Sequence, residues 1–552
     1  MPDADLDRDL RSIQEARSLG RAARSAQRAF ESAGQDRVDA VVEAMATAGR
    51  RESERLARMA HEETGYGSTA DKARKNDFVL RDVVDAMRGM RTVGVIGEDA
   101  ASGVREIAAP VGVVAGIIPS TNPTSTALFK CLIAVKARCG IVLSPHPGAR
   151  ACIKAAADVM AEAAVAAGAP KGLIGCMTVV TMEGTRELME GDATDVILAT
   201  GGMGLVRAAY SAGKPAFGVG PGNVPAYVHA SADVAKAVDD IFAGTTFDNG
   251  TLCSSEQSII CDRAIAGEVR DAVRARGGHF LDPDECRSLA EVLITDDLLV
   301  DPALVGQPAT RVAEAAGIEV PEDTRVLICP QEGAGPDFPL SREKLSPVLA
   351  YYEVEDWREG CERCVELLRF GGMGHTLVIH SRDEDVVLEF GLHKPAHRVL
   401  VNTVAALGAI GHTTGLFPSM TLGCGSWGNN ITSDNVGPQH LIDVKRLARE
   451  IRPLKGDTAS EASGSAASGE SVERLSEPAT GRPGQEPTDP LRERVSDFLA
   501  ERGIIRGGRP PGGTGSHVED CGCEVCSDTT GTTAGAVRPH PPRGGQGGET
   551  TA

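Results

Sequence analysis

Short apolar runs that alternate with alanine-rich segments constrain the fold of this chain more than any other feature. From about residue 105 onward, the runs at residues 111–118, 141–143 and 196–198 have the length and composition of buried strands. Each run is followed by a turn and then by a segment of helical composition. This alternation predicts the α/β class, with a parallel sheet whose strands are joined by helices.

The same pattern returns later in the chain and predicts a second α/β region over residues 245–425. Its candidate strands are residues 256–261, 377–380 and 399–402. Residues 6–90, which precede both regions, are expected to be helical because their apolar residues recur at helical spacing. A length of 552 residues is enough for two to four domains.

The composition changes sharply beyond Pro453, where Gly, Ser, Pro, Glu and Thr dominate. Residues 456–488 are expected to form a flexible linker and residues 504–552 a disordered tail. Between them, residues 489–503 predict a short amphipathic helix, with Leu491, Val495, Phe498 and Leu499 on one face. This helix either recruits the protein to a partner, which we favour, or packs on the protein itself.

Charge and composition exclude several classes of partner. A net charge of −20 disfavours nucleic acids and anionic membranes, which require a basic surface, so small molecules and proteins remain. The acidic N-terminus has no signal-peptide pattern and no apolar run is long enough to span a bilayer, which predicts a cytoplasmic protein. The fourteen cysteines are mostly isolated in apolar segments, as expected in a reducing compartment.

One of these cysteines, Cys253, has the surroundings of a nucleophile. Gly250 precedes it, and Ser254 and Ser255 follow it, so that the backbone can bend around a substrate and the thiol stays accessible. The alternative is a buried structural cysteine. We assign that role instead to Cys131, Cys139, Cys152, Cys261 and Cys329, which lie within apolar runs.

Two glycine-rich turns and one asparagine add the elements of a cofactor site and an oxyanion site. Residues 199–204 and 217–223 each follow a strand-like run, where glycines let the backbone approach a pyrophosphate. Neither is a clean dinucleotide fingerprint, and packing turns are an equal alternative. Asn122, directly after an apolar run, can donate its amide to an oxyanion, although an ordinary Asn-Pro turn has the same sequence.

Together, these segments resemble the aldehyde dehydrogenase superfamily, and within it the coenzyme-A-acylating branch typified by the N-terminal half of bifunctional aldehyde/alcohol dehydrogenases. The resemblance extends to about residue 450. The motifs that carry it are residues 121–126, 144–147, 198–202, the Cys253 loop, 343–347, 374–376 and 422–428.

The resemblance implies a domain organisation and a set of site residues. A Rossmann-like cofactor domain would occupy residues 1–244 with part of an oligomerisation arm near 100–120, a catalytic domain 245–425, and the rest of the arm 426–455. Cys253 would be the nucleophile, Asn122 the oxyanion donor and His375 a helper for coenzyme A, with a structural histidine as the alternative. The residues expected along the bound NAD are Ser144, Pro145, Thr200, Gly201, Gly202, Gly220 and Glu343.

A departure from the superfamily pattern predicts the type of reaction. Hydrolytic members carry a glutamate just before the second glycine-rich segment, whereas residues 216–223 contain no carboxylate. Without this base, an acyl thioester on Cys253 should persist until coenzyme A arrives, because a thiol pKa lies much closer to neutrality than that of water. The prediction is reversible oxidation of a short-chain aldehyde to acyl-CoA; the alternatives are sulfoacetaldehyde as substrate, a hydrolytic dehydrogenase, and a non-catalytic scaffold.

The resemblance also predicts partners. A homo-oligomer is expected, and residues 489–503 resemble the encapsulation peptides that bind shell proteins of bacterial microcompartments. The tail also contains a histidine and three cysteines, residue types that bind metals: His517, Cys521, Cys523 and Cys526. We interpret them as a site of adventitious binding or redox reactivity. We therefore predict no metal site.

Overall fold

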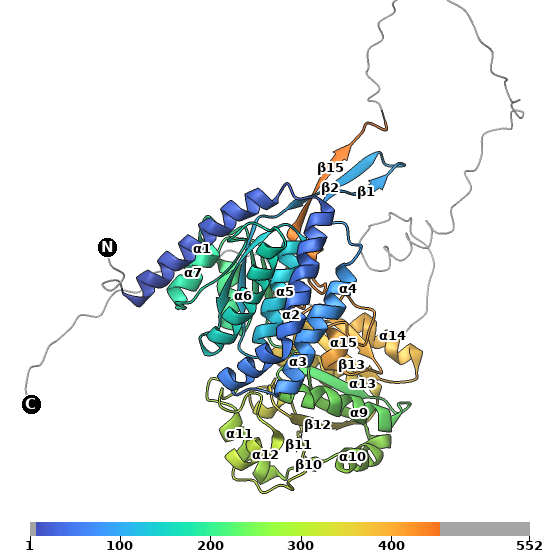
Figure 1. The fold of residues 1–552 in the computed structure, drawn as a ribbon. Helices are drawn as coiled ribbons and strands as arrows, with labels where there is room; N and C mark the ends of the chain where they lie inside the picture. Colours follow the sequence, from blue (N-terminus) through green and yellow to red (C-terminus); the bar gives the residue numbers. More distant parts are fainter. Residues whose placement is uncertain (1–6, 453–552) are drawn as a thin grey trace, which may run out of the picture. The chain divides into compact units, whose positions relative to one another are not determined.

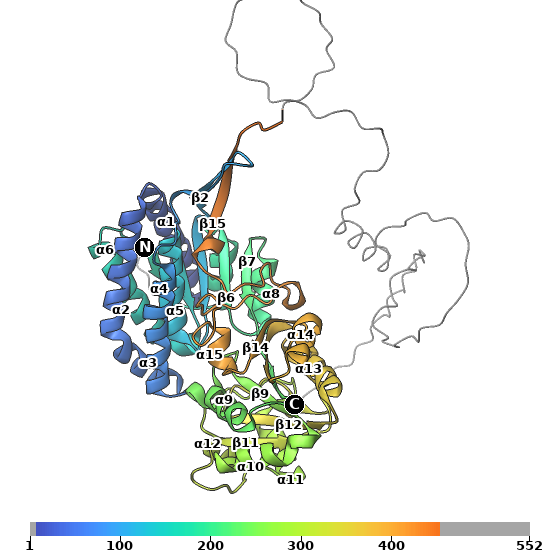
Figure 2. The same ribbon diagram turned by 90° about the vertical axis from the view of Figure 1, so that its right-hand side faces the viewer.

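The computed structural model describes residues 7–452, which form two parallel sheets, a small antiparallel sheet and the helices around them (Figures 1 and 2). The α/β class predicted from the sequence is confirmed. The predicted linker, amphipathic helix and tail, residues 456–552, lie outside the described residues. Over residues 7–452, no helix is both long and apolar enough to cross a membrane.

Four N-terminal helices confirm the helical prediction for residues 6–90, and α3 continues into α4 through a π-helical turn at Val79–Val83. Their buried faces carry small apolar residues at helical spacing, such as Ala16, Ala23 and Ala26 in the first helix. The bounds are α1 Arg8–Phe30, α2 Gln35–Thr64, α3 Thr69–Phe78 and α4 Val84–Met87.

The first parallel sheet has five strands in the order β5-β4-β3-β6-β7. Its strands are β3 Val113–Ile118, β4 Gly140–Pro145, β5 Ile174–Cys176, β6 Val196–Thr200 and β7 Ala216–Val219. Its connecting helices are α5 Pro123–Lys136, α6 Arg150–Ala166, α7 Met182–Glu190 and α8 Met203–Ser211. The strands predicted near residues 111–118, 141–143 and 196–198 are therefore confirmed.

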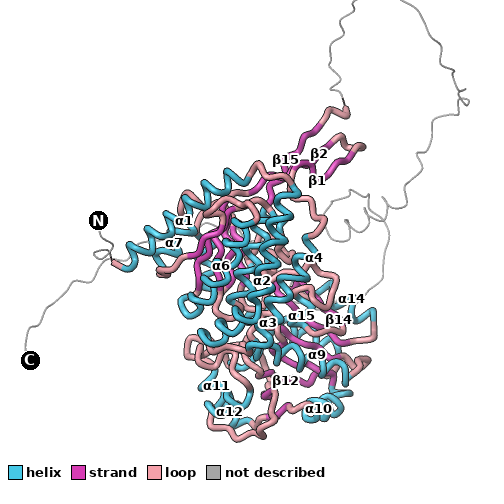
Figure 3. The backbone as a smooth tube through the Cα atoms, viewed as in Figure 1, coloured by secondary structure: helices cyan, strands magenta, loops and turns pink. Residues whose placement is uncertain are grey.

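Both faces of this sheet are covered, which explains why its strands are continuous apolar runs. Along β3, Val113, Ala115 and Ile117 pack on one side with residues of α1, α7 and α8. Val114 and Ile118 pack on the other side with α2, α5 and α6. The strands therefore lie between two helical layers (Figure 3).

The second parallel sheet has seven strands in the order β10-β11-β12-β9-β8-β13-β14. Its strands are β8 Val224–Val228, β9 Glu256–Asp262, β10 Gly278–Phe280, β11 Val326–Pro330, β12 Val348–Val354, β13 Gly374–His380 and β14 Ala396–Val401. Its helices are α9 Val234–Thr246, α10 Ala266–Ala275, α11 Pro283–Leu293, α12 Ala309–Ala315, α13 Trp357–Gly371, α14 Glu384–His393 and α15 Ala405–Ala409. The three predicted strands of this region are confirmed as β9, β13 and β14.

Strand pairing bears on the domain division that we predicted from the resemblance. β8 pairs with β9 and β13, so the second sheet begins before the predicted boundary at residue 245. β8 is an apolar run like those of the first sheet, and the sequence does not say which strands it pairs with. The domain bounds stay predictions.

The third sheet is antiparallel, in the order β1-β2-β15, and extends away from the two parallel sheets in both views (Figures 1 and 2). Its strands are β1 Gly94–Asp99, β2 Val104–Pro110 and β15 Ile442–Ala448. It joins two segments that are far apart in the sequence, residues 94–110 and 442–448, and much of β1 and β15 is exposed. It remains our candidate for the predicted oligomerisation arm. Residues 113–118, which fall within the range near 100–120 where we expected part of the arm, belong to β3.

Candidate active site

Cys253 lies in a tight loop between α9 and β9. The loop begins with the 3-10 turn Phe247–Gly250, in which Asp248, Asn249 and Gly250 have φ angles of 48°, 51° and 76°. Asp, Asn and Gly are the residues that best tolerate this left-handed conformation. A Cβ on Gly250 would lie 3.1 Å from the backbone of Ser346, so the local sequence is what allows the loop to form.

The thiol of Cys253 is partly exposed, whereas Cys131, Cys139, Cys152, Cys261 and Cys329 are buried as predicted. The two serines after it have a different role from the one we inferred. Both are fully buried, and the Ser254 hydroxyl donates to the Ala406 carbonyl at 3.0 Å. Ser254 thus anchors the loop to α15, whereas the buried Ser255 hydroxyl has no hydrogen-bond partner among the described residues.

Asn122 forms the N-cap of α5, just after the carboxyl end of β3. Its Oδ1 accepts a hydrogen bond from Lys75 Nζ at 2.6 Å, and its Nδ2 donates to the Thr251 carbonyl at 3.2 Å. The Asn122 amide is therefore attached to the loop that carries Cys253. The alternative of an isolated Asn-Pro turn does not account for this contact.

The second glycine-rich segment passes directly against the same loop. A Cβ on Gly222 would lie 1.7 Å from the Cys253 carbonyl oxygen and 3.3 Å from His375 Nδ1. The Gly222 amide donates to Glu343 Oε1 at 2.8 Å. Only glycine permits this approach, so the fold gathers Cys253, Gly222, Glu343 and His375 at one place.

His375 is fully buried at the start of β13. Its Nδ1 lies 2.9 Å from the Thr376 hydroxyl, while its Nε2 has no hydrogen-bond partner among the described residues. Burial and the charge of Arg398 lower the pKa of His375 well below its usual range, so the imidazole is neutral. An unpartnered buried nitrogen is costly to keep, and it is an available acceptor or donor for a molecule bound here.

The electrostatics of the site oppose ionisation of Cys253, the predicted nucleophile. Burial, together with the neighbouring Glu343 and Cys424, raises the pKa of the Cys253 thiol to about 12, although Arg398 and a backbone amide favour the thiolate. Burial also raises the pKa of Glu343 to about 7. The resting thiol is therefore protonated and must lose its proton during the reaction.

The residues expected to hold a dinucleotide lie at the carboxyl ends of β4 and β6. Ser144 and Pro145 end β4 and are buried, with the Ser144 hydroxyl 2.8 Å from that of Thr185. Thr200 ends β6, and Gly201 and Gly202 lead from it into α8. Among the described residues, none of these five predicted cofactor residues is hydrogen-bonded to the Cys253 loop, residues 251–255.

The geometry at the end of β6 fits a nucleotide pyrophosphate. The strand order reverses between β3 and β6, which is where parallel sheets bind ligands. Thr200 Oγ1 is buried without a partner there, and nothing lies within 4 Å of where Cβ atoms on Gly202 and Gly204 would be, at the start of α8. Open backbone amides at a helix N-terminus suit an anionic group.

Gly220 connects this region to the thiol. A Cβ on Gly220 would lie 2.9 Å from the Met203 sulfur in the first turn of α8, and Gly222, two residues further, touches the Cys253 loop. The segment 220–222 thus runs from the predicted nucleotide site to the Cys253 loop. This continuity is what a reaction between a bound cofactor and a thiol-bound substrate requires.

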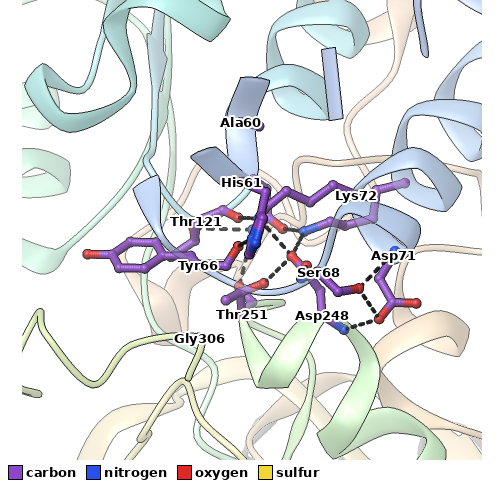
Figure 4. A network of polar contacts seen from close by, with 12 residues as sticks. Ala60, His61, Tyr66, Ser68, Asp71, Lys72, Thr121, Asp248, Thr251 and Gly306 are labelled. Carbon is purple, nitrogen blue, oxygen red and sulfur yellow. Dashed lines mark hydrogen bonds and ion pairs between the residues drawn. The ribbon is translucent and has the colours of Figure 1, made fainter. Parts of the chain in front are cut away.

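The structure adds four residues that the sequence did not reveal. Lys72, Lys75 and Asp248 form a buried ionic cluster next to Asn122. Figure 4 shows the Lys72 and Asp248 side chains of this cluster. Arg398 lies near Cys253 and His375. Lysines three apart on a polar helix ordinarily face solvent, and no pattern in the sequence marks these two as buried.

The fold and this arrangement define a class of enzyme in which a parallel nucleotide-binding sheet and a second parallel sheet share a site with a loop cysteine. The model of the aldehyde dehydrogenase family matches residues 11–279. An acetylating aldehyde dehydrogenase from Geobacillus thermoglucosidasius has a similar structure, with 50% sequence identity and a TM-score of 0.80 over 82% of this chain and 100% of that one. This chain belongs to the aldehyde dehydrogenase family.

Two other relatives extend the comparison. The bifunctional aldehyde-alcohol dehydrogenase AdhE of Escherichia coli is 42% identical over 448 residues, which cover 80% of this chain and 50% of the relative. This chain therefore spans about half the length of that relative. A propionaldehyde dehydrogenase from a fucose utilisation bacterial microcompartment of Clostridium phytofermentans has 26% identity and a TM-score of 0.73, over 80% of this chain and 99% of that one.

Proposed function

We propose that this protein oxidises a short-chain aldehyde to acyl-CoA, reversibly, with a nicotinamide cofactor and with Cys253 as the nucleophile. The proposal depends on one observation: the glycine-rich segment that packs against the Cys253 loop, residues 216–223, contains no carboxylate. The relatives whose names include acetylating or aldehyde-alcohol dehydrogenase support the same reaction.

In the proposed reaction, the Cys253 sulfur forms a bond to the aldehyde carbon, and the carbonyl oxygen becomes an oxyanion. The Asn122 amide donates to that oxygen and stabilises its charge. The nicotinamide ring supplies the hydride acceptor when the cofactor is bound. Loss of hydride leaves a thioester on Cys253, and attack by the coenzyme A thiolate releases acyl-CoA and the Cys253 thiolate.

The thiol protons need an acceptor because both sulfurs react as thiolates. The Cys253 proton passes to solvent, which reaches this partly exposed residue. His375 is the residue we propose for the coenzyme A thiol: it is neutral, and its buried Nε2 has no partner among the described residues. Glu343, bound to the Gly222 amide, is proposed to bind the nicotinamide ribose, and its own position beside the thiol opposes ionisation of Cys253.

The end of β6 supports the cofactor assignment. The unpartnered Thr200 hydroxyl and the open amides at Gly202 and Gly204 would hold the pyrophosphate, with Ser144, Pro145, Gly201 and Gly220 beside it. We propose NAD over NADP from the family resemblance. Acetaldehyde and propanal are the proposed substrates, with sulfoacetaldehyde as the alternative.

The deciding experiment is to mix enzyme, aldehyde and NAD without coenzyme A and follow NADH absorbance. We expect a burst of one NADH per active site and then a stall, because residues 216–223 lack the glutamate that activates water in hydrolytic members. Addition of coenzyme A should restore steady turnover and yield acyl-CoA. Steady NADH formation with free acid and no coenzyme A would instead establish the hydrolytic alternative, and a panel of aldehydes in the same assay identifies the substrate.

We also propose that the protein acts inside a bacterial microcompartment as a homo-oligomer. The support is the apolar face of residues 489–503 in the sequence and the microcompartment origin of the Clostridium relative. Fusing residues 485–506 to a fluorescent protein should carry it into a shell, while enzyme truncated after Lys455 should stay active but diffuse. Loss of activity or of oligomeric state on truncation would mean that the segment packs on the enzyme.

A further inference from the structure

Two buried lysines share one buried aspartate beside Asn122. Lys72 and Lys75 lie one helical turn apart on α3, and each is only 2% exposed. Asp248, fully buried in the loop before Cys253, accepts from Lys72 Nζ at 3.0 Å and from Lys75 Nζ through the same oxygen, Oδ2. Burying two ammonium groups on one carboxylate is costly, so the cluster is a poor device for stability alone.

The rest of the cluster fixes the position of Asp248. Its Oδ1 accepts from the Ser68 amide at 2.8 Å, and its Oδ2 also accepts from the Thr251 hydroxyl at 2.6 Å (Figure 4). Asp71, the other nearby carboxylate, accepts from the Asp248 amide at 3.1 Å. Every contact of Asp248 is thus internal, and the carboxylate presents a fixed partner to Lys75.

Lys75 is the member that touches the proposed oxyanion donor. Its Nζ donates to Asn122 Oδ1 at 2.6 Å. An ammonium group can only donate, so the oxygen of the Asn122 amide must face Lys75 and the nitrogen must face away from it. The nitrogen then lies 3.2 Å from the Thr251 carbonyl, two residues before Cys253.

The opposite orientation of the amide would place two N–H groups against the ammonium and leave Oδ1 beside the Thr251 carbonyl. Both contacts would be repulsive, and a buried unpaired polar group costs about 1–3 kcal/mol. The charge of Lys75 also withdraws electrons from the amide and strengthens its N–H groups as donors. Burial lowers the pKa of Lys75 to about 8 in spite of the neighbouring Asp248, so the group is still charged at neutral pH.

Lys72 provides an internal comparison. It lies on the same helix, is equally buried and binds the same oxygen of Asp248, but its second contact is the Thr121 carbonyl at 3.4 Å. Among the described residues it makes no hydrogen bond with Asn122. The two lysines therefore differ mainly in contact with the oxyanion donor.

We propose that Lys75, held by Asp248, is a positioning residue that keeps the N–H groups of the Asn122 amide directed toward the Cys253 loop. The inference rests on the proposed function, since it needs Asn122 as the oxyanion donor. Lys75 itself touches neither substrate nor sulfur, and its effect passes through Asn122.

The test is the rate of the NADH burst without coenzyme A, measured by stopped flow in the full-length enzyme. Burst amplitude counts the folded active sites, so the rate constant is independent of any unfolded fraction. Lys75→Met should slow the burst by about tenfold or more, because one oxyanion donor is worth about a hundredfold or more in rate. The KM for NAD should not change. Lys72→Met is the matched control and should keep a burst rate within about threefold of wild type.

A double-mutant cycle separates positioning from other effects. If Lys75 acts through Asn122, adding Lys75→Met to Asn122→Ala should change the burst rate by less than about twofold. An equal loss in both backgrounds, or a wild-type rate in Lys75→Met, would overturn the proposal. Lys75→Leu is a second apolar variant should the first be insoluble. If Asn122→Ala bursts at the wild-type rate, the oxyanion role fails and this inference with it, whereas absence of any burst in wild type refutes the proposed function itself.

Discussion

The reactivity of Cys253 toward a small alkylating agent is a direct test of its surroundings. Its pKa of about 12 is well above the value of about 8.5 for a free cysteine. At pH 8 the thiolate fraction of Cys253 is then about 10⁻⁴, against about a quarter for the free thiol, a deficit of about three orders of magnitude. A more basic thiolate is intrinsically more nucleophilic, which recovers about half of this deficit on a logarithmic scale. We expect Cys253 to react roughly fiftyfold more slowly than free cysteine at pH 8.

The assay is iodoacetamide labelling of the apoenzyme from pH 6 to pH 10, quantified by mass spectrometry of the peptide that contains Cys253. The labelling rate should rise about tenfold per pH unit between pH 7 and pH 10 without a plateau, because the thiolate fraction grows by that factor below the pKa. Cys361, also partly exposed, is the internal control in a separate peptide.

The same pH profile also tests the sign of the interaction between Glu343 and the Cys253 thiol. Its negative charge raises the pKa of Cys253, and its own pKa is about 7. Glu343→Gln should therefore accelerate labelling by about threefold to tenfold above pH 8, where the wild-type carboxylate is ionised. At pH 6, where it is protonated, the two enzymes should differ little.

Three results would refute this reasoning. A plateau in the labelling rate near pH 8 or 9 would mean that burial does not raise the pKa of the Cys253 thiol. Slower labelling in Glu343→Gln would reverse the sign of the interaction. An equal change at Cys361 would show that the substitution disturbs the whole protein and not the site.

Three further substitutions have defined outcomes. Cys253→Ala should abolish NADH formation but leave NAD binding by fluorescence titration nearly unchanged, since the thiol forms the covalent bond and not the cofactor site; residual turnover would remove Cys253 from the mechanism. Gly222→Ala should lose most activity and also lower the denaturation midpoint, because its Cβ would lie 1.7 Å from the Cys253 carbonyl oxygen and must displace the loop; near-normal kcat would show that the loop shifts without affecting the site. Lys130→Met should lower the urea midpoint by the equivalent of about 2–5 kcal/mol, because Lys130 Nζ donates to the Ile117 and Leu198 carbonyls and both would lose a buried partner; an unchanged midpoint would contradict this role.

The sequence by itself determined much of the fold and the candidate nucleophile. Strands such as β3, β4 and β6 are short apolar runs bounded by turn residues, so local composition is enough to locate them. Cys253 is predicted as the nucleophile from the glycine before it and the small serines after it, which are again local features.

Tertiary structure decided the features that depend on contacts between distant segments of the chain. β8 joins the second sheet although it resembles a strand of the first, because pairing depends on distant partners. Ser254 and Ser255, which were expected to leave the thiol accessible, are fully buried, and Ser254 is hydrogen-bonded to α15. Lys75 would be predicted on a solvated helix surface, and only the fold places Asp248 and Asn122 around it, 173 and 47 residues away in sequence. Burial and the pairing of charges arise from contacts between distant segments, and a local sequence pattern does not specify those contacts.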